Sequence, residues 1–449
     1  MKLLVGLGET VLGPGKLSGR LANAPLVFAT GWILFFWLRR EIGLIWAVVA
    51  AGMWWVLPRA VEGAGIRVDR FVYLEPGMVT FGVAAVALGW WWYRRGHWWL
   101  AALAGAFMAL SVTSKVSIAF LAFSFVFLIV LRREVARGLV AAAAYVAAFA
   151  LVFVAVYLPA GMVSGIRYMV AFQAAQRAQG HPVTILGARV AHPPWWANLY
   201  FTLEGFGPWL LVLLLAAAVF AFVPRTTALA AYVAVCTALL LVFYCLVAGN
   251  ALPHYYYAWT WAVYVLAAIG LSSLWRLASR ARTRSRPGDR RGRGVLARGL
   301  VLVALVALAV SGLQTTRAIR DERPTGFALV ASVLRQHGEG ARRVLNDGYP
   351  GWQFLPYLGG RVITRHTPLY LSYAAAGGVF GAIAVLPMER DDVARFVRAD
   401  AARLVHVDVD GVELYILRGG RTLSAAGGTL HIDRKGPRLH TASACCQPA

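Results

Sequence analysis

Apolar runs, each close to the length that a helix needs to cross a lipid bilayer, dominate the chain up to residue 315. A membrane-spanning helix requires about 20 predominantly apolar residues, within a range of roughly 17–25. By that measure we expect transmembrane helices over 22–38, 42–58, 76–93, 97–113, 116–131, 137–158, 208–223, 226–248, 253–275 and 299–315. The sequence therefore predicts an α-helical polytopic membrane protein with about ten transmembrane helices.

The charged residues are distributed unevenly along the chain. They make up only 14% of it, against about 25% in average soluble domains, and most of the acidic ones lie in the last third. There the pattern changes to short segments, with a helix expected over 327–337 and strands over 404–408 and 412–417. We therefore expect a small α/β domain at 316–418. Residues 419–449 lack periodicity, which predicts a disordered tail.

The net charge of +24 points first to a nucleic-acid partner. The arginines, however, fall in short gaps between apolar runs, where the positive-inside rule places them on the cytoplasmic side of a membrane. The densest group has nine arginines between Arg276 and Arg298, against the single Asp289. We therefore expect a basic cytoplasmic linker at 276–298, a last transmembrane helix at 299–315, and no nucleic-acid partner.

The same rule decides how often the apolar stretch 97–131 crosses the membrane. Arg94 and Arg95 precede this stretch, and Arg132 and Arg133 follow it. Because both pairs are expected inside, an even number of crossings lies between them. The stretch therefore predicts two helices with a turn near Lys115, on the outer face.

Alternation of sides then assigns the remaining loops. The loops 59–75 and 159–207 and the 316–418 domain fall outside, which predicts a multi-pass protein of the cell membrane with an extracytoplasmic C-terminal domain. Residues 1–21 also fall outside, although no earlier span carries them across. We expect an outer interfacial segment there.

The stretch from Arg67 to Pro76 concentrates ionisable residues at the outer mouth of a predicted span. It contains Arg67, Asp69, Arg70 and Glu75. Ionisable groups at that depth are costly unless they face a polar cavity, so they predict a functional site. The structural alternative is that Glu75 only stabilises the start of the helix that begins at Pro76, where the helix dipole favours an acid.

Four further residues on the same predicted face are candidates for binding a substrate: Lys115, His192, His254 and Tyr255. Each has a structural alternative, because a lysine can extend from a helix end to water and aromatic-flanked residues suit the headgroup region. No motif for a P-loop, a dinucleotide site, a zinc protease or a redox cysteine pair occurs. Asp408-Val409-Asp410 is assigned to a hairpin turn and not to a metal site.

Five short segments occur in a fixed order along the first 275 residues. They are Gly19-Arg20-Leu21, Tyr73-Leu74-Glu75-Pro76, Leu103–Lys115, His192–Trp196 and His254-Tyr255. With this order and topology the chain resembles the GT-C superfamily of lipid-carrier-dependent membrane glycosyltransferases. Within it, the closest likeness is to the protein mannosyltransferase and aminoarabinose transferase group (glycosyltransferase family 39 and RgtA/B/C/D-like proteins). The resemblance implies a GT-C-like transmembrane body at 22–275.

The resemblance also implies an activity. The chain would move a sugar from a polyprenyl-phosphate carrier to an acceptor on the outer face of the membrane, with inversion. A carboxylate, Glu75 or Asp69, would act as the base. The basic residues that would hold the carrier phosphate are Arg67, Arg70, Lys115 and His254. The expected partners are the polyprenyl-phosphate sugar donor and membrane lipid, and the cofactor is left open, with a divalent cation as the candidate.

Two features depart from the family pattern. Glu75 stands where the group more often has Asp, and the group's first helix and acidic loop have no counterpart in residues 1–21. We therefore expect a hydrophobic helix followed by Asp or Glu to be encoded upstream in frame, or else a short form that inserts with its N-terminus outside. Two other functions stay open: a transporter of lipid-linked sugar, although no repeat between halves is visible, and a non-catalytic membrane scaffold.

Overall fold

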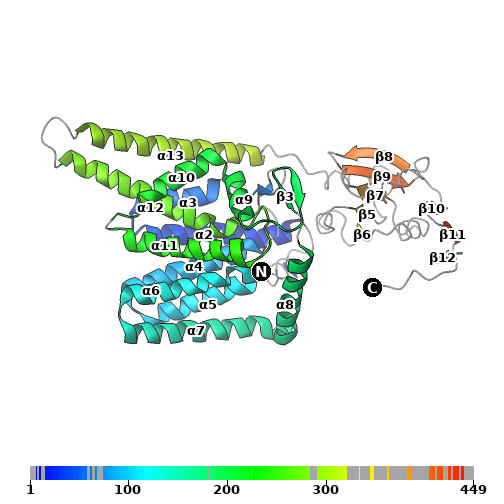
Figure 1. Cartoon of the computed structure of the whole chain (residues 1–449), viewed down its shortest axis with the longest axis horizontal. Helices are drawn as coiled ribbons and strands as arrows, with labels where there is room; N and C mark the ends of the chain where they lie inside the picture. The colour runs from blue at the N-terminus through cyan, green and yellow to red at the C-terminus, as the bar shows by residue number, and fades with distance from the viewer. Residues whose placement is uncertain are drawn as a thin grey trace. The chain divides into compact units, whose positions relative to one another are not determined.

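The computed structural model forms two compact units, one mainly of residues up to Asp321 and the other mainly of residues from Glu322 onward. Among the described residues, the first unit is mostly helical and the second consists mainly of strands (Figure 1). The described residues are 7, 10–11, 16–57, 61–62, 66–67, 74–180, 183–223, 225–283, 291–320, 333, 344–347, 362–363, 382–385, 404–409, 412–417, 423–425, 428–433 and 436–438.

Each apolar run identified in the sequence forms a helix or a pair of consecutive helices in the first unit. The helices are α2 (Lys16–Leu38), α3 (Leu44–Val56), α4 (Glu75–Arg95), α5 (Trp98–Ser114), η2 (Val116–Phe123), α6 (Ser124–Arg132), α7 (Val135–Tyr157), α10 (Pro208–Val219), α11 (Thr227–Val242), η4 (Phe243–Val247), α12 (Tyr257–Thr283) and α13 (Arg291–Arg320). Of these, η2 is a 3₁₀ helix and η4 is one turn of π-helix.

Only some of these helices are long enough to cross a membrane by themselves. Among the described residues, four pass on length and apolar composition: Val135–Tyr157, Thr227–Val247, Tyr257–Ser279 and Val295–Arg317. The pair α9 (Ala197–Phe206) and α10, which is bent by 100°, raises the number to five if it counts as one span. A mostly helical membrane protein is thus confirmed, whereas the total of about ten crossings stays a prediction.

Helix α12 lies at the centre of the helical unit. In its most apolar window 67% of residues are buried, against 11% for α7 at the edge of the unit (Figure 1). It packs against α3, α10, α11 and α13. Trp261 of α12 meets Trp37 of α2 with 6.5 Å between ring centroids, and Tyr257 meets Trp54 of α3 at 5.3 Å. Large aromatic rings therefore fill the centre of the unit.

Helix α5 packs between α4 and α7. Its Gly105 faces the backbone of Tyr145 on α7, so closely that an added Cβ would collide with the Tyr145 carbonyl oxygen. Small residues permit this close approach in membrane helices, where van der Waals packing drives association. The α5–α7 contact therefore depends on a glycine at this position.

The ends of α4 are fixed by residues that the sequence places there. Pro76 occupies the first turn, where a missing N–H is tolerated. At the other end, Gly96 closes the helix with a left-handed φ of 81°. Arg132 donates hydrogen bonds to the carbonyls of Trp92 and Tyr93 at 3.0 and 2.7 Å. Helix α4 thus has a defined start, at which Glu75 lies.

The apolar stretch 97–131 folds as two helical segments and not as one helix. Helix α5 ends at Ser114, Lys115 adopts extended backbone with φ −156° and ψ 119°, and η2 begins at Val116. The turn predicted near Lys115 from the parity of the flanking arginines is therefore confirmed.

The segment 159–207, predicted to be an outer loop, has its own secondary structure. Helix α8 (Met162–Gln179) runs crosswise to α7 at one end of the unit (Figure 1). Strands β3 (Val183–Ile185) and β4 (Ala188–Val190) follow as a hairpin. Leu186 and Gly187 form its two-residue turn, both with positive φ, as the primed hairpin turns require.

The second unit contains a five-stranded mixed sheet with strand order β6-β5-β7-β9-β8. The strands are β5 (Val344–Asp347), β6 (Val362–Ile363), β7 (Ala382–Val385), β8 (Leu404–Val409) and β9 (Val412–Leu417). β5, β6 and β7 are parallel, whereas β9 runs antiparallel to both β7 and β8. The two strands predicted over 404–408 and 412–417 are confirmed, while the helix predicted over 327–337 lies almost wholly outside the described residues.

Three short strands follow in the segment that was expected to be disordered. They are β10 (Leu423–Ala425), β11 (Gly428–Asp433) and β12 (Gly436–Arg438), paired antiparallel in that order. β10 and β12 have three residues each and are too short to show a hydrophobic period, whereas β11 has six residues and was missed by the sequence analysis. The position of the 316–418 domain outside the membrane stays a prediction.

Candidate active site

Glu75 is the first residue of α4, and its side chain is almost fully buried. The residue has 2% of its surface exposed. A carboxylate at a helix N-terminus is favoured by the helix dipole, but burying it still requires partners that replace water. Those partners come from segments that lie far from Glu75 in the sequence.

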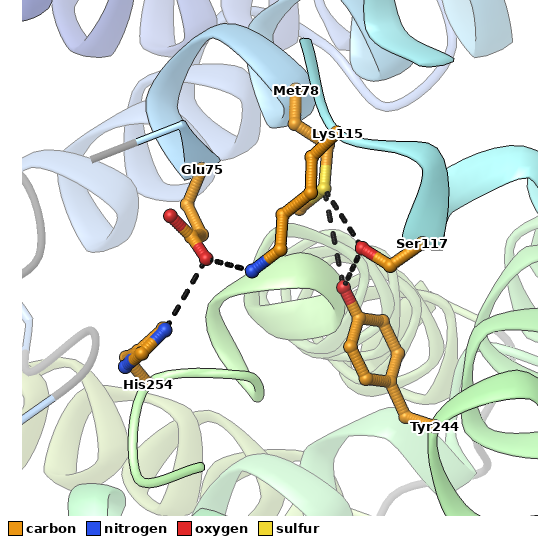
Figure 2. A network of polar contacts seen from close by, with 6 residues as sticks. All are labelled: Glu75, Met78, Lys115, Ser117, Tyr244 and His254. Carbon is orange, nitrogen blue, oxygen red and sulfur yellow. Dashed lines mark hydrogen bonds and ion pairs between the residues drawn. The ribbon is translucent and has the colours of Figure 1, made fainter. Parts of the chain in front are cut away.

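Lys115 and His254 contact the same oxygen of Glu75 (Figure 2). Lys115, in the turn between α5 and η2, donates a hydrogen bond from its ammonium to Oε1. His254, in the connection before α12, places Nε2 3.3 Å from the same atom. Figure 2 shows the two side chains approaching Oε1 from different sides, while the other carboxylate oxygen points away from both. The contacts join the start of α4 and two connections of the chain at one point.

Short turns fix the backbone on which His254 and Tyr255 lie. The N–H of Tyr255 donates to the carbonyl of Leu252 at 3.0 Å, and the N–H of Tyr257 donates to the carbonyl of His254 at 3.1 Å. Tyr255 in turn presents its ring to Lys115, whose ammonium lies 4.4 Å from the ring centroid. An aromatic face attracts a cation, so Tyr255 helps to hold Lys115 toward Glu75.

A second polar contact group lies beside Lys115. Ser117 of η2 and Tyr244 of η4 share a hydrogen bond of 2.7 Å, and both hydroxyls lie within 4 Å of the sulfur of Met78 on α4 (Figure 2). Tyr244 also packs against Tyr255, with 5.0 Å between ring centroids. These residues form the wall next to the ion pair.

Asn198 of α9 supports the π-helical turn that carries Tyr244. Its amide donates to the carbonyl of Tyr244 at 2.8 Å and to that of Asn250 at 3.4 Å. A π-helical turn interrupts the regular hydrogen-bond ladder and is common at functional sites. Asn198 therefore satisfies one carbonyl of the π-helical turn and one of the connection that follows it.

The electrostatics of the site follow from burial and pairing. An ion pair removed from water is strongly coupled, because the effective dielectric constant inside a protein is low. Removing one partner of such a pair leaves an uncompensated charge. Lys115 keeps 20% of its side chain exposed, against 3% for Glu75. The lysine is therefore the member of the pair that an incoming anion can engage first.

The structure brings four of the predicted site residues together: Glu75, Lys115, His254 and Tyr255. His192 is exposed in the bend after β4 and makes no contact with this group in the described part of the chain. Arg67 lies in the short strand β2 (Ile66–Arg67), paired with β1 (Val61–Glu62), and its side chain lies outside the description. Asp69 and Arg70 lie outside the described residues.

Three contributors were not identified from the sequence: Ser117, Tyr244 and Asn198. Ser117 and Tyr244 are single polar residues within long apolar runs, and a polar side chain at that depth needs a partner. That signal was available, but it does not name the partner, because Ser117 and Tyr244 are 127 residues apart.

The described residues do not fit a divalent cation. No group of three or more His, Cys, Asp or Glu side chains converges among them. Glu75, the buried carboxylate of the site, is paired with an ammonium, which repels a metal ion. The two arginines and the aspartate of the 67–70 stretch do not enter this test, because their side chains lie outside the description.

Comparisons with known proteins show where this architecture recurs. No protein-family model and no curated protein matches the chain. The crystal structure of ArnT from Cupriavidus metallidurans bound to undecaprenyl phosphate matches with a TM-score of 0.55 and 15% identity, over 92% of this chain and 86% of that one. The apo ArnT structure matches over the same shares with a TM-score of 0.53 and 14% identity. The chain therefore has the fold of ArnT, one of the GT-C membrane glycosyltransferases that its sequence resembles.

Proposed function

We propose that the chain is a glycosyltransferase that moves a sugar from a polyprenyl-phosphate carrier to an acceptor, at the outer face of the cell membrane. The observation that carries the proposal is the buried Glu75 carboxylate, held by Lys115 and His254 at the start of α4. It occurs on a fold shared with ArnT, which was crystallised with undecaprenyl phosphate bound. A site with one carboxylate next to an ammonium and an imidazole suits a donor whose leaving group is a phosphate.

Lys115 and His254 are proposed to bind the carrier phosphate. Both side chains can donate hydrogen bonds to a phosphate, and such bonds are charge-assisted. In the free protein they are engaged by Glu75, so an entering phosphate would compete for them. That competition loosens the hold on Glu75 and leaves its carboxylate able to accept a proton.

The proposed reaction is a single displacement at the anomeric carbon. Glu75, with Asp69 as the second candidate, takes the proton from the acceptor hydroxyl while the acceptor oxygen forms its bond to the anomeric carbon. The bond from that carbon to the phosphate oxygen breaks, and its electron pair leaves with the polyprenyl phosphate. The configuration inverts. Lys115 and His254 stabilise the negative charge that the phosphate gains.

Substrate binding is proposed to involve residues around this centre. The further residues proposed to bind the substrate are Arg67, Arg70, His192 and Tyr255. Tyr255 is supported by its contact with Lys115, and the others by their position in the sequence. Membrane lipid is the second proposed partner, because the carrier enters sideways from the bilayer.

The test is transfer from a panel of radiolabelled undecaprenyl-phosphate sugars by the purified full-length protein in lipid nanodiscs. We expect release of labelled sugar from the carrier with at least one donor, and loss of that release in Lys115→Met. The matched control is Glu134→Gln, which removes an exposed carboxylate paired with Arg137 at 2.7 Å and should leave transfer unchanged.

The alternatives give different results in the nanodisc assay and in a matched vesicle assay. A scaffold would bind a lipid-linked sugar without releasing it. A transporter would move the intact donor between the leaflets of a vesicle. The proposal is contradicted if no donor of the panel releases its sugar. It is also contradicted if the release does not depend on Lys115.

A further inference from the structure

Helix α9 runs in a different direction from the helix that follows it. Gly207, with φ 75°, lies between α9 and α10, and Pro208 is the first residue of α10. Glycine adopts this φ at low cost, and proline begins a helix without losing a hydrogen bond. The angle between the two helices is 100°. Because 208–223 is predicted to cross the membrane, α9 is expected to lie along its surface.

Two hydrogen bonds place α9 at the level where spanning helices end. The candidate span Thr227–Val247 ends just after Tyr244, and the next candidate span begins at Tyr257. The amide of Asn198 donates to the carbonyl of Tyr244 at 2.8 Å and, in the connection between the two spans, to that of Asn250 at 3.4 Å. Since a spanning helix ends near the surface of the bilayer, α9 lies at that surface.

The two faces of α9 differ in burial. One face packs on the helical unit, where the buried Phe206 meets Tyr256 of the connection before α12 with 5.7 Å between ring centroids. Gly205 lies so close to the same tyrosine that an added Cβ would collide with its ring. The opposite face exposes 40% of Leu199 and 42% of Leu203. The helix is therefore held by packing on one side and presents an apolar surface on the other.

Three tryptophans border this exposed face. Trp195 and Trp196 precede α9, and Trp209 follows it in the first turn of α10. All three are exposed. Tryptophan is enriched at the headgroup level of membranes, because its ring is apolar and its N–H is polar. The composition of the face therefore matches the interface of a bilayer.

The face carries almost no charge. Residues 191–209 contain no lysine or arginine. Their single acid, Glu204, accepts a hydrogen bond from the hydroxyl of Tyr200 at 3.1 Å. Recognition of anionic lipids depends on clustered basic residues. The face is therefore suited to the apolar part of the interface and not to the charge of a headgroup.

We propose that α9 lies in the plane of the membrane, with its exposed face covered by phospholipid at the boundary between headgroups and acyl chains. The partner is a lipid surface of either headgroup charge. Because Asn198 on the buried face holds η4, one helix connects this lipid surface to the wall next to the Glu75 site. The proposal does not rest on the proposed transfer reaction. The side chains in contact with lipid are those of Trp195, Trp196, Leu199, Leu203 and Trp209.

The test measures the depth of single fluorophores in a bilayer. Full-length protein with one introduced cysteine is labelled with NBD and placed in phosphatidylcholine nanodiscs. These contain nitroxide lipids that quench either at the headgroup or near the middle of the bilayer. Cys245, Cys445 and Cys446 are replaced by serine, whereas Cys236 is kept because it is fully buried.

Two pairs of exposed positions are matched in their spacing along a helix. Leu199→Cys and Leu203→Cys on α9 should lie at one depth and be quenched more by the headgroup nitroxide. Leu215→Cys and Val219→Cys on α10 should be quenched more by the deep nitroxide and differ in depth by up to about 6 Å, since a helix rises about 1.5 Å per residue. If an α9 variant is not monodisperse, Trp195→Cys takes its place. Replacing half of the phosphatidylcholine by phosphatidylglycerol should leave all depths unchanged.

Four results would overturn the proposal. A depth difference within the α9 pair as large as that within the α10 pair would show that α9 dips into the bilayer. Quenching by aqueous iodide and by neither lipid would show a face in water, and protection from all three quenchers would show that another protein chain covers it. A shift in depth with phosphatidylglycerol would show recognition of anionic headgroups. Because no measurement uses a sugar donor, a failure here leaves the proposed transferase untouched, and the reverse also holds.

Discussion

One carboxylate oxygen of Glu75 accepts a hydrogen bond from the ammonium of Lys115 and lies next to an imidazole nitrogen of His254. Glu75 lies in the first turn of α4, and Lys115 and His254 lie in connections between helices, so all three side chains come from helix ends or turns. The ion pair can stabilise the fold, because it neutralises a buried acid. It can also support catalysis, because it keeps a carboxylate that can act as a base in the site. Variants of the two partners separate these two roles.

Glu75→Gln should lower turnover by roughly 10²–10⁴-fold, the usual contribution of a general base. It should also lower the free energy of unfolding by about 3 kcal/mol, because Lys115 is left without its anion. A protein with several kcal/mol of stability in reserve stays folded after that loss. Turnover with a panel donor and reversible unfolding in mixed micelles provide the two measurements.

The double variant Glu75→Gln with Lys115→Met distinguishes the roles. Since no unpaired charge remains, the free energy of unfolding should recover most of the loss seen in the single variant, which makes the two substitutions strongly non-additive. Turnover should not recover. If the double variant is active, Glu75 is only a partner for Lys115 and the base is a different residue.

At the scale of single elements, breaks in regular helix position the site. The extended backbone at Lys115 and the π-helical turn η4 each direct one side chain toward the start of α4. Asn198 holds η4 by donating to the carbonyl of Tyr244, and it also donates to the carbonyl of Asn250 in the connection that follows. An interrupted helix in an apolar environment requires such substitutes for its missing hydrogen bonds.

Asn198→Ala should therefore lower the free energy of unfolding by about 1–3 kcal/mol, the usual penalty for leaving a buried polar group unsatisfied. Gln173→Ala is the control, because Gln173 is exposed on α8 and should change stability by no more than about 0.5 kcal/mol. Unfolding in mixed micelles compares the two. An equal effect would show that Asn198 does not support η4.

A matched pair of glycines tests the packing of α5 against α7. Gly105→Ala should destabilise the protein by roughly 1–3 kcal/mol, because the new methyl group meets the backbone carbonyl of Tyr145 and not a side chain that can move. Gly52→Ala on α3, where no atom lies within 4 Å of the new Cβ, should stabilise by about 0.5–1 kcal/mol. Opposite signs in an unfolding experiment are the expected result, and the same sign in both variants would contradict the packing argument.

For the whole molecule, the central prediction is topology. The 276–298 linker should be cytoplasmic and the 316–418 domain outside, since a short loop with nine arginines resists translocation. In a background without the four native cysteines, an impermeant thiol reagent should label Ser372→Cys in intact cells but not Ser285→Cys. Permeabilised cells should label both, and labelling of Ser285→Cys in intact cells would reverse the topology.

The sequence by itself determined the elements that depend on short-range pattern. The lengths of the apolar runs predicted the helices, and the arginines that flank 97–131 predicted the turn at Lys115, because both rest on local hydrophobicity and charge. The strands β8 and β9 were predicted from alternation over six residues each. The ordered motifs also suggested the GT-C fold, which the likeness to ArnT confirms.

Tertiary structure alone decided which of the candidate residues meet. Glu75 contacts Lys115, which lies 40 positions later in the chain. His192 lies in an equally suggestive aromatic run, yet it stays exposed and apart from them. The pairing of Ser117 with Tyr244 also became visible only in three dimensions. The physical reason is that helix formation is governed by neighbours in sequence, while side-chain contacts depend on how the helices pack, and packing is set by shape complementarity at positions such as Gly105 that no local pattern distinguishes.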